Sequence, residues 1–341
     1  MIKTIGIDVG KTVFHLVAFD ERGHILMRKR LSRPQLLHTT VNLPPCLIGM
    51  EACCGAHYLG RLLVAQGHDV RLMPAQFVRP FVKSNKNDYL DAEAIAEAVQ
   101  RPTMRFVALK TDAQLDLQAL HRVRNRLVGR RTAVINQIRA FLLERGLTVA
   151  SGPRRLRERL PWLLEDSNPA LSEQIRRVLR QLWEEWQQLE IETKTVTTEI
   201  ERIAATDDTC QRLVGVPGIG PLVATALVAA AGSGSGFSNG RDLAAWLGLV
   251  PRQHSTGGKP KLLGISKRGN PYLRRLFVQG ARSALLHLRR DRHRFGPWLD
   301  ELQARAHPNV VAIALANKLA RIAWVILRTG QSYQPGLVGN P

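Results

Sequence analysis

The pattern of apolar and polar positions changes along the 341-residue chain. In the first hundred residues, short β-rich runs at 2–9, 12–19 and 24–31 predict three antiparallel strands, because only a few residues separate each run from the next. Strand and helix patterns then alternate, which predicts a mixed sheet covered by helices, an α/β fold. The alternating part has predicted strands at 46–51 and 69–73, and predicted helices at 34–41, 56–66 and 88–99.

The central third follows a helical period. Apolar residues recur every seven residues in a predicted helix at 112–145, and a second long helix is predicted at 169–205. More than four heptads in the second helix favour a coiled coil, and a long helix packed within its own domain is the alternative. Its heptad positions hold Ile175, Leu179, Leu182, Trp186, Leu189, Thr193, Val196, Ile200 and Ile203.

The last third is helical and punctuated by glycines, so the complete fold class is α/β plus all-α. Together with the length of the chain, these changes predict three domains, at 1–108, 109–206 and 207–341. The apolar helix predicted at 309–328 is interrupted by polar residues, and we expect no run of the roughly 18 residues that cross a bilayer. The other helices of this part are predicted at 207–214, 221–231, 241–247, 271–287 and 297–306, and 154–159 lie in a predicted loop.

The chain is strongly basic, with 49 Lys and Arg against 28 Asp and Glu, a formal net charge of +21. Such an excess predicts a polyanionic partner, with nucleic acid ahead of an anionic membrane surface. A hydrophobic content of 45% excludes global disorder. The four cysteines form no C-x-x-C pair and the first residues lead directly into a strand, so we expect reduced thiols in a cytosolic protein that does not enter a membrane.

Four acidic residues form the most informative set. Asp8 and Glu51 each end a predicted buried strand, and Asp88 and Asp91 share one face of a predicted helix. If the two strands are neighbours and the helix crosses their ends, the four carboxylates converge, and oxygen ligands of this kind suit Mg²⁺ or Mn²⁺. The alternative is that Asp8 and Glu51 pair with arginines while the other two acids cap a helix.

Basic side chains gather in two places, which predicts two contacts with nucleic-acid phosphates. Between them, Gly218 and Gly220 separate two predicted helices in a pattern typical of a helix-hairpin-helix, whose backbone N–H groups bind phosphate. A turn with a purely structural role is equally compatible with this pattern. The basic residues are Arg122, Arg124, Arg126, Arg130 and Arg131 of the central helix, and Lys259, Lys261, Lys267, Arg268, Arg274 and Arg275 near the C-terminal helices.

Two blocks of this sequence resemble one known family. Asp8, Glu51, Asp88 and Asp91, in this order, look like the DEDD tetrad of the insertion-sequence-110 family of transposases. The stretches 247–259 (LGLVPRQHSTGGK), 263–270 (LGISKRGN) and 272–275 (YLRR) look like the C-terminal domain of that family, closest to its 1111-type subgroup. Because the two blocks lie far apart and in the expected order, the resemblance covers nearly the whole chain.

The resemblance implies a fold, an activity and partners. The N-terminal domain is expected to be similar to the RuvC Holliday-junction resolvase, an RNase H-like fold. The activity implied is DNA recombination through a serine nucleophile, guided by a structured non-coding RNA whose loops pair with target and donor DNA. Members of the family are expected to act as a dimer or tetramer in which the acids of one subunit face the serine of another.

Ser255 is the nucleophile that the resemblance implies. A hydroxyl is a weak nucleophile at neutral pH, so a base or a metal must activate it. Sliding the alignment by one residue would place Thr256 there, but the 1111-type subgroup keeps serine at the position of Ser255. Aromatic residues make up only 6% of the chain, so a guide RNA is expected to bind by shape and phosphate contact, while base pairing carries specificity.

Three other functions are compatible with parts of the sequence. A RuvC-like metal-dependent nuclease or junction resolvase would use the four acids without a serine intermediate. An actin-like ATPase or sugar kinase would use 6–12 (GIDVGKT) as a phosphate loop, but the chain holds no convincing second phosphate loop and such an enzyme does not explain the charge of +21. A nucleic-acid-binding protein without catalysis would tolerate loss of Asp8 or Glu51.

Overall fold

The computed structural model describes residues 1–83, 87–165 and 169–335. The chain divides into two compact units. The first unit contains Met1–Gln114 and Ala231–Leu243, and the second contains Leu115–Ala230 and Ala244–Pro341. The central helices and the C-terminal residues thus share one unit, and the division into domains at 1–108, 109–206 and 207–341 stays a prediction.

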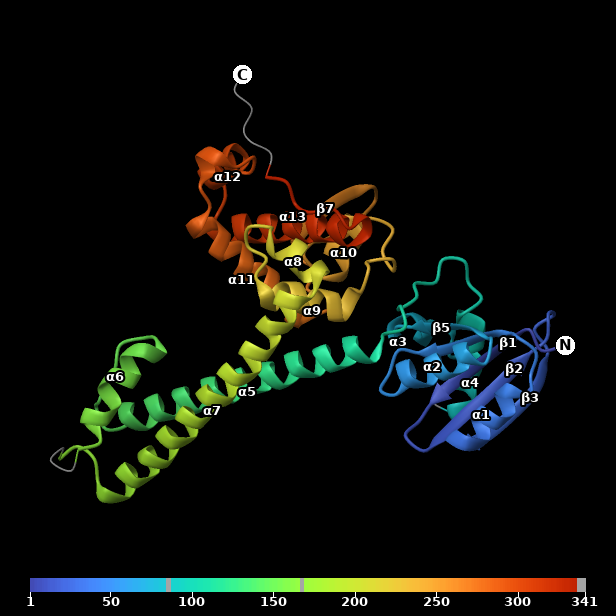
Figure 1. Cartoon of the computed structure of the whole chain (residues 1–341), viewed down its shortest axis with the longest axis horizontal. Helices are drawn as coiled ribbons and strands as arrows, with labels where there is room; N and C mark the ends of the chain where they lie inside the picture. The colour runs from blue at the N-terminus through green and yellow to red at the C-terminus, as the bar shows by residue number, and fades with distance from the viewer. Residues whose placement is uncertain (84–86, 166–168, 336–341) are drawn as a thin grey trace. The chain divides into compact units, whose positions relative to one another are not determined.

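The first unit is built on a five-stranded mixed sheet, as the strand pattern predicts (Figure 1). The strand order is β3-β2-β1-β4-β5. β1 pairs antiparallel with β2 and parallel with β4, so the sheet is mixed at its centre. Their bounds are β1 (Thr4–Val9), β2 (Val13–Phe19), β3 (Ile25–Ser32), β4 (Leu47–Glu51) and β5 (Asp69–Met73).

Helices cover both faces of this sheet. Ile5 and Ile7 of β1 are fully buried in one core with α1 (Arg33–Val41) and α2 (Ala56–Ala65). The other face packs against α4 (Asp88–Ala98), which buries alanines such as Ala92 and Ala96 against β2. Because successive side chains of a strand point to opposite faces, Gly6 and Asp8 lie on the α4 side. A short helix α3 (Ala75–Val78) and a 3-10 turn η1 (Arg79–Phe81) follow β5 and were not predicted.

α4 lies unusually close to β1 because Gly6 has no side chain. A Cβ atom at Gly6 would lie 2.0 Å from the carbonyl oxygen of Ala92 and 2.6 Å from the amide nitrogen of Ala96. Any larger residue at this position would therefore push the helix away from the sheet. This contact holds the middle of α4 against β1.

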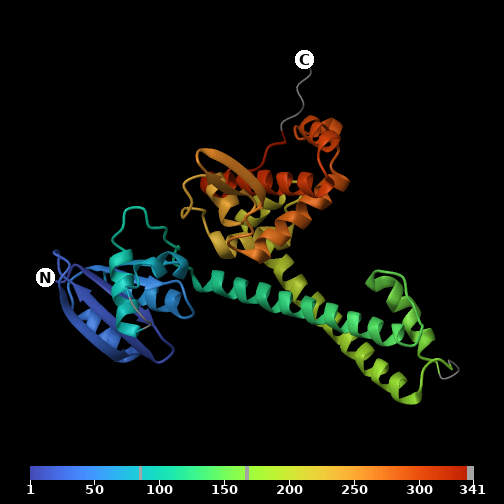
Figure 2. The same cartoon turned by 180° about the vertical axis from the view of Figure 1, so that it is seen from behind.

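Two long helices run side by side in the second unit, α5 (Asp112–Leu143) and α7 (Glu173–Thr206), as both views show (Figures 1 and 2). Leu179, Trp186 and Leu189 of α7 pack in one apolar cluster with Leu127 and Val134 of α5. The heptad residues of α7 are thus covered within the same chain, and a supercoiled arrangement stays a prediction.

The segment that the sequence pattern assigns to a loop at 154–159 is helical, so that prediction is wrong. It belongs to α6 (Pro153–Leu163), which begins with a proline and buries Leu156 and Leu160 against α5 and α7. The apolar residues recur four apart and face the core, while the intervening arginines face outwards. The dense charge of the segment concealed this helical period.

The C-terminal part of the second unit is mostly helical, and its helices lie within a few residues of their predicted bounds. A β-hairpin, β6 (Pro251–Thr256) and β7 (Lys259–Ile265), lies between the helices predicted at 241–247 and 271–287, where no strand was predicted. The helices are α8 (Asp208–Val214), α9 (Pro221–Ala231), α10 (Gly240–Trp246), α11 (Pro271–His287), α12 (Gly296–Arg305) and α13 (Pro308–Thr329), with a 3-10 turn η2 (Arg290–Arg292).

One helix in the described part of the chain, α13, is long and apolar enough to cross a membrane by length and composition alone. The expectation that no segment reaches this length is therefore wrong by that criterion. Half of its most apolar window is buried inside the protein, where Val311, Leu315 and Leu319 are fully covered. α13 packs against α8, α11 and α12, which is the arrangement of a core helix.

Candidate active site

The ends of β1 and β4 bring two of the predicted acids to one edge of the sheet. The strands are parallel neighbours with Ile7 opposite Met50, and Asp8 and Glu51 are the next residues of each strand. The prediction that these acids end adjacent strands is confirmed. Both side chains are half-buried on the face that α4 covers.

The first turn of α4 carries the other two acids, Asp88 and Asp91. The helix begins there because the Asn87 side chain accepts a hydrogen bond from the Tyr89 amide at 2.9 Å. Negative charge is favourable at this end of a helix. The close contact of Gly6 with Ala92 and Ala96 holds the following turns of α4 against the sheet, and the Asp88 carboxylate lies close to Asp8.

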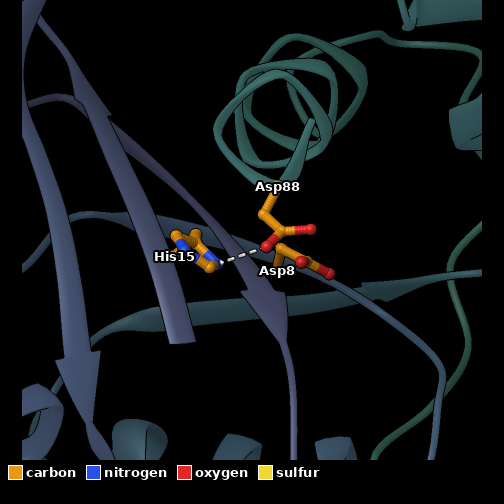
Figure 3. Close-up of side chains that lie close together, drawn as sticks. All are labelled: Asp8, His15 and Asp88. Carbon is orange, nitrogen blue, oxygen red and sulfur yellow. Dashed lines mark ion pairs between the residues drawn. The ribbon is translucent and has the colours of Figure 1, made fainter. Parts of the chain in front are cut away.

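Asp8 and Asp88 form a tight group with a third residue, His15 of β2 (Figure 3). One ligand atom from each of the three side chains lies within 4.8 Å of the others. The Nδ1 atom of His15 is 3.6 Å from the Oδ2 atom of Asp88. The His15 side chain is almost fully buried, whereas the Asp88 side chain is more than half exposed.

Glu51 and Asp91 lie outside this tight group, but Glu51 interacts electrostatically with Asp8 and Asp91. Burial raises the pKa of the Glu51 carboxyl, and the charges of Asp8 and Asp91 raise it further. Among the described residues, no ion pair joins Glu51 or Asp91 to a lysine or arginine. The alternative that arginines neutralise Glu51 therefore has no support.

This set of donors fits a divalent cation. The charges of Asp8 and Asp91 act on Glu51, for which the described residues provide no Lys or Arg partner, and such repulsion is relieved when a cation occupies the space between the carboxylates. Carboxylate oxygens are the ligands that Mg²⁺ and Mn²⁺ share. We regard Asp8, Glu51, Asp88 and Asp91 as the candidate metal ligands.

His15 is a candidate that the sequence reasoning missed. The pairing of β1 with β2 would have revealed it, because His15 lies directly opposite Asp8 across the two strands. An imidazole in an otherwise apolar strand, opposite an acid, can bind a metal such as Mn²⁺ or orient a carboxylate that does.

Ser255 lies in the second unit, on β6 of the exposed hairpin. The Nε2 atom of Gln253 donates a hydrogen bond to the Ser255 hydroxyl oxygen at 2.7 Å. Ser255 pairs with Pro260 of β7 and Thr256 pairs with Lys259, so the two hydroxyls point to opposite faces of the hairpin. Both residues are exposed, and the hairpin turns at Gly257 and Gly258.

The basic residues near the hairpin differ in their contacts. Lys259, Lys261, Lys267 and Arg268 are exposed. The guanidinium of Arg274 donates to the carbonyl oxygens of Leu247 and Arg268 at 3.0 and 3.1 Å, which holds the base of the hairpin. Arg275 donates to the Asn125 side chain of α5. Phosphate binding by these residues stays a prediction.

The arginines of α5 likewise fall into two groups. The side chain of Arg124 donates to the Thr197 hydroxyl at 2.8 Å, and Arg130 pairs with Glu185 at 2.9 Å, so both connect α5 to α7. Arg131 is half-buried, whereas Arg122 and Arg126 are exposed. Arg122 and Arg126, which are exposed and make no such contact with α7 among the described residues, are therefore better placed for nucleic acid than Arg130, which is exposed but paired, and than Arg124 and Arg131.

The two glycines between α8 and α9 differ in their surroundings. Gly218 has a left-handed φ of 91°, and a Cβ atom there would lie 2.8 Å from the carbonyl oxygen of Gly280 in α11. This contact supports a structural role for Gly218. A Cβ atom at Gly220 would meet no atom within 4 Å, so phosphate binding at this turn stays a prediction for Gly220 in particular.

Comparison with known proteins finds matches along both parts of the chain. A family model described as a transposase, named for DEDD residues and IS110, matches residues 5–145. A second, described as the IS116/IS110/IS902 family of transposases, matches residues 210–295. The first match includes all four candidate acids, and the second includes Ser255.

Several proteins are similar to this chain over nearly its whole length. The transposase for insertion sequence element IS1328 of Yersinia enterocolitica is 46% identical over 329 residues, which cover 96% of this chain and 98% of that protein. A probable family 20 transposase of Pseudomonas aeruginosa is 44% identical over 336 residues, 98% of this chain and 99% of that protein. The transposase for insertion sequence element IS1111A of Coxiella burnetii is 42% identical over 335 residues, 98% and 92% of the two chains.

Proposed function

The chain belongs to the IS110/IS116/IS902 family of insertion-sequence transposases, and from this we propose that it cuts and rejoins DNA through Ser255, assisted by a divalent metal held by Asp8, Glu51, Asp88 and Asp91. As a transposase it is an enzyme that acts on DNA. The observation that carries the proposal is the placement of Asp8 and Glu51 at the ends of the neighbouring strands β1 and β4, with Asp8 close to Asp88 of α4 and with the charges of Asp8 and Asp91 acting on Glu51. The mixed sheet beneath them is consistent with a DEDD nuclease-like fold, and a RuvC or RNase H-like identity is part of the proposal.

The acids provide the site for the scissile phosphate. A divalent cation bound there, Mg²⁺ or Mn²⁺, supplies positive charge to the attacking and leaving oxygens. Asp8 and Glu51 are held in position because they lie at the ends of strands in a packed sheet. Asp88 and Asp91 are held in position by α4, which packs closely against β1 at Gly6. The Nδ1 atom of His15 lies 3.6 Å from the Asp88 carboxylate, on the strand next to Asp8.

Ser255 carries the covalent step. Its Oγ atom attacks the phosphorus, an Oγ–P bond forms, and one bond between phosphorus and a deoxyribose oxygen breaks. The hydroxyl proton of Ser255 passes to solvent, and the leaving deoxyribose oxygen takes up a proton. Rejoining is the reverse reaction with a hydroxyl group of another strand. Because Gln253 donates to the Ser255 oxygen, the hydroxyl proton stays available for this transfer.

A pair of neighbouring substitutions tests the nucleophile. Ser255→Ala should abolish both recombination and the protein–DNA adduct that survives denaturing electrophoresis, because no Oγ–P bond can form. Thr256→Ala is the matched control, since its hydroxyl is equally exposed on the opposite face, and it should keep the adduct. If Ser255→Ala still cleaves DNA efficiently, the metal-dependent nuclease without a serine intermediate is the better reading.

The guide RNA is the second part of the proposal. Exposed Arg122 and Arg126, the exposed lysines of the hairpin and the charge of +21 support binding of a structured RNA through its phosphates. We expect an RNA to co-purify with the chain from cells that carry its element. Full recombination activity after exhaustive RNase treatment would exclude this partner.

A homo-oligomer, either a dimer or a tetramer, is the third part. The acids belong to the first unit and Ser255 to the second, which allows an active site shared between subunits. Mixing an Asp8→Ala variant with a Ser255→Ala variant should then restore part of the activity that each lacks alone. Restoration at no mixing ratio would contradict a shared site. We expect this chemistry to take place in the prokaryotic cytosol, where the DNA of the element lies.

A further inference from the structure

A half-open cavity of about 350 Å³ lies in the second unit between α5, α9 and the start of α11. Alanines of α9, among them Ala229 and Ala230, form its apolar floor. Tyr272 lines another side, and the Arg275 guanidinium lies 5.4 Å from the centre of its ring. The volume lies in the range of small-molecule sites, and neither the candidate acids nor Ser255 line it. We call it the α5–α11 cavity.

Tyr272 is held in one orientation by a chain of hydrogen bonds. The Thr225 hydroxyl donates to the Pro221 carbonyl at 2.6 Å, so it accepts from the Nε2–H group of His121 at 3.0 Å. The Nδ1 atom of His121 must then accept from the Tyr272 hydroxyl, at 2.9 Å. Burial lowers the pKa of His121 to about 4, which keeps the imidazole neutral, as these hydrogen bonds require. The aromatic wall is therefore preorganised.

The rim of the cavity is rich in hydrogen-bond donors. The side-chain oxygen of Asn270 accepts from the Tyr272 and Leu273 amides, so its NH₂ group remains to donate. The side-chain oxygen of Asn125 accepts from Arg275, so the NH₂ group of Asn125 also remains to donate. Arg122 is exposed at the same rim, and no hydrogen bond or ion pair holds its guanidinium within the described residues.

We propose that the α5–α11 cavity binds one unpaired nucleobase of a nucleic acid, with guanine preferred. An aromatic side chain and an apolar floor suit the face of a base, and the donors of Arg122 and Asn125 suit the O6 and N7 acceptors of guanine. Exposed Arg126, one turn along α5, is placed for a flanking phosphate. This inference rests on the proposed function, because it requires that the second unit holds nucleic acid.

Binding to bulged duplexes tests the cavity. The full-length chain is titrated, by fluorescence anisotropy, into three short DNA duplexes that are fully paired, carry one unpaired guanosine, or carry an abasic nucleotide at the same bulge. The guanosine bulge should bind about tenfold tighter than the other two, because a stacked base contributes that much and the abasic bulge bends the helix without offering a base. Repeating the titrations with RNA duplexes of the same three designs shows whether DNA or RNA supplies the base.

Two substitutions connect the preference to the cavity. Ala230→Leu fills its floor and should remove the preference for the guanosine bulge, with paired-duplex affinity unchanged. Ala119→Leu is the matched control on exposed α5 surface outside the cavity, and it should keep the preference. Gln118→Ala removes a donor from the cavity lining without loss of a side-chain hydrogen bond within the described residues, and should weaken the preference even if Ala230→Leu folds poorly.

The outcomes separate this inference from the proposed function. Equal binding of guanosine and abasic bulges, in both DNA and RNA, would overturn the cavity's role and leave the transposase mechanism standing. A preference that survives Ala230→Leu in a folded protein would do the same. Failure to bind any duplex would contradict the proposed function itself.

Discussion

The contact between α4 and β1 makes a sharp prediction about Gly6. In Gly6→Ala, the new Cβ atom would lie 2.0 Å from the Ala92 carbonyl oxygen, whereas real Cβ contacts essentially never fall below 3.0 Å. The helix must therefore move by about 1 Å or more, the difference between these two distances. Since the atoms involved are backbone atoms, no side-chain rotation can relieve the overlap.

The movement should act on both stability and catalysis. Overpacking of this kind costs about 1–3 kcal/mol, so the thermal unfolding midpoint should fall by several degrees. α4 carries Asp88 and Asp91, and a displacement of about 1 Å at a catalytic site can reduce the rate about 100-fold. We expect the loss of cleavage to be larger than the loss of folded protein explains.

The assay compares folding, metal binding and cleavage in the same preparations. Circular dichroism gives the unfolding midpoint, and Mn²⁺ titration gives metal affinity. Gly129→Ala is the matched control, because a Cβ atom there meets nothing within 4 Å on exposed α5 and alanine is the better helix former by about 1 kcal/mol. A Gly6→Ala protein with normal Mn²⁺ affinity and normal cleavage would refute the reasoning.

Two further predictions concern the acids and their neighbour. Burial and the charges of Asp8 and Asp91 raise the pKa of Glu51, so the metal-free protein should lose stability as the pH rises from the ordinary value of 4.5 through the raised pKa. Glu51→Gln should then raise the unfolding midpoint near neutral pH in the presence of chelator while abolishing cleavage, and a lowered midpoint would count against the repulsion. His15→Asn should weaken Mn²⁺ binding about 10- to 100-fold, because it removes the imidazole that lies 3.6 Å from the Asp88 carboxylate and next to Asp8. The exposed His24→Asn serves as its control, and equal affinities for Mn²⁺ in the two variants would disprove the role of His15.

Much of the first unit could be predicted from the sequence because its patterns are local. Alternation in β1 places Ile5 and Ile7 in one core and Asp8 on the other face, and the order of strands and helices determines which strands are neighbours. The acids at the strand ends followed from the same pattern. His15 was missed because its role depends on the cross-strand register with Asp8, which requires the hairpin to be built first.

The second unit was harder because its contacts are distant in sequence. The partners of Tyr272 are His121, 151 residues away, and through it Thr225. No period in the sequence predicts such a pairing, so the α5–α11 cavity could not be foreseen. The β6–β7 hairpin was missed for another reason, since β6 is exposed throughout and β7 is half-buried only at Leu263 and Ile265, so neither strand shows the sustained apolar alternation that reveals a half-buried strand.

The two halves of the proposed site have opposite mechanical character. The acids lie on elements packed on both sides, where Gly6 leaves no freedom for α4 to shift, whereas Ser255 lies on a hairpin whose first strand is exposed throughout. Metal ligands need fixed positions before the substrate arrives, because their geometry selects the ion. A nucleophile that becomes attached to DNA must instead move with the strand it carries between cleavage and rejoining. Strand exchange through a serine would therefore require both a rigid carboxylate site and an exposed serine hairpin. A nuclease that hydrolyses DNA with water has no use for the serine hairpin.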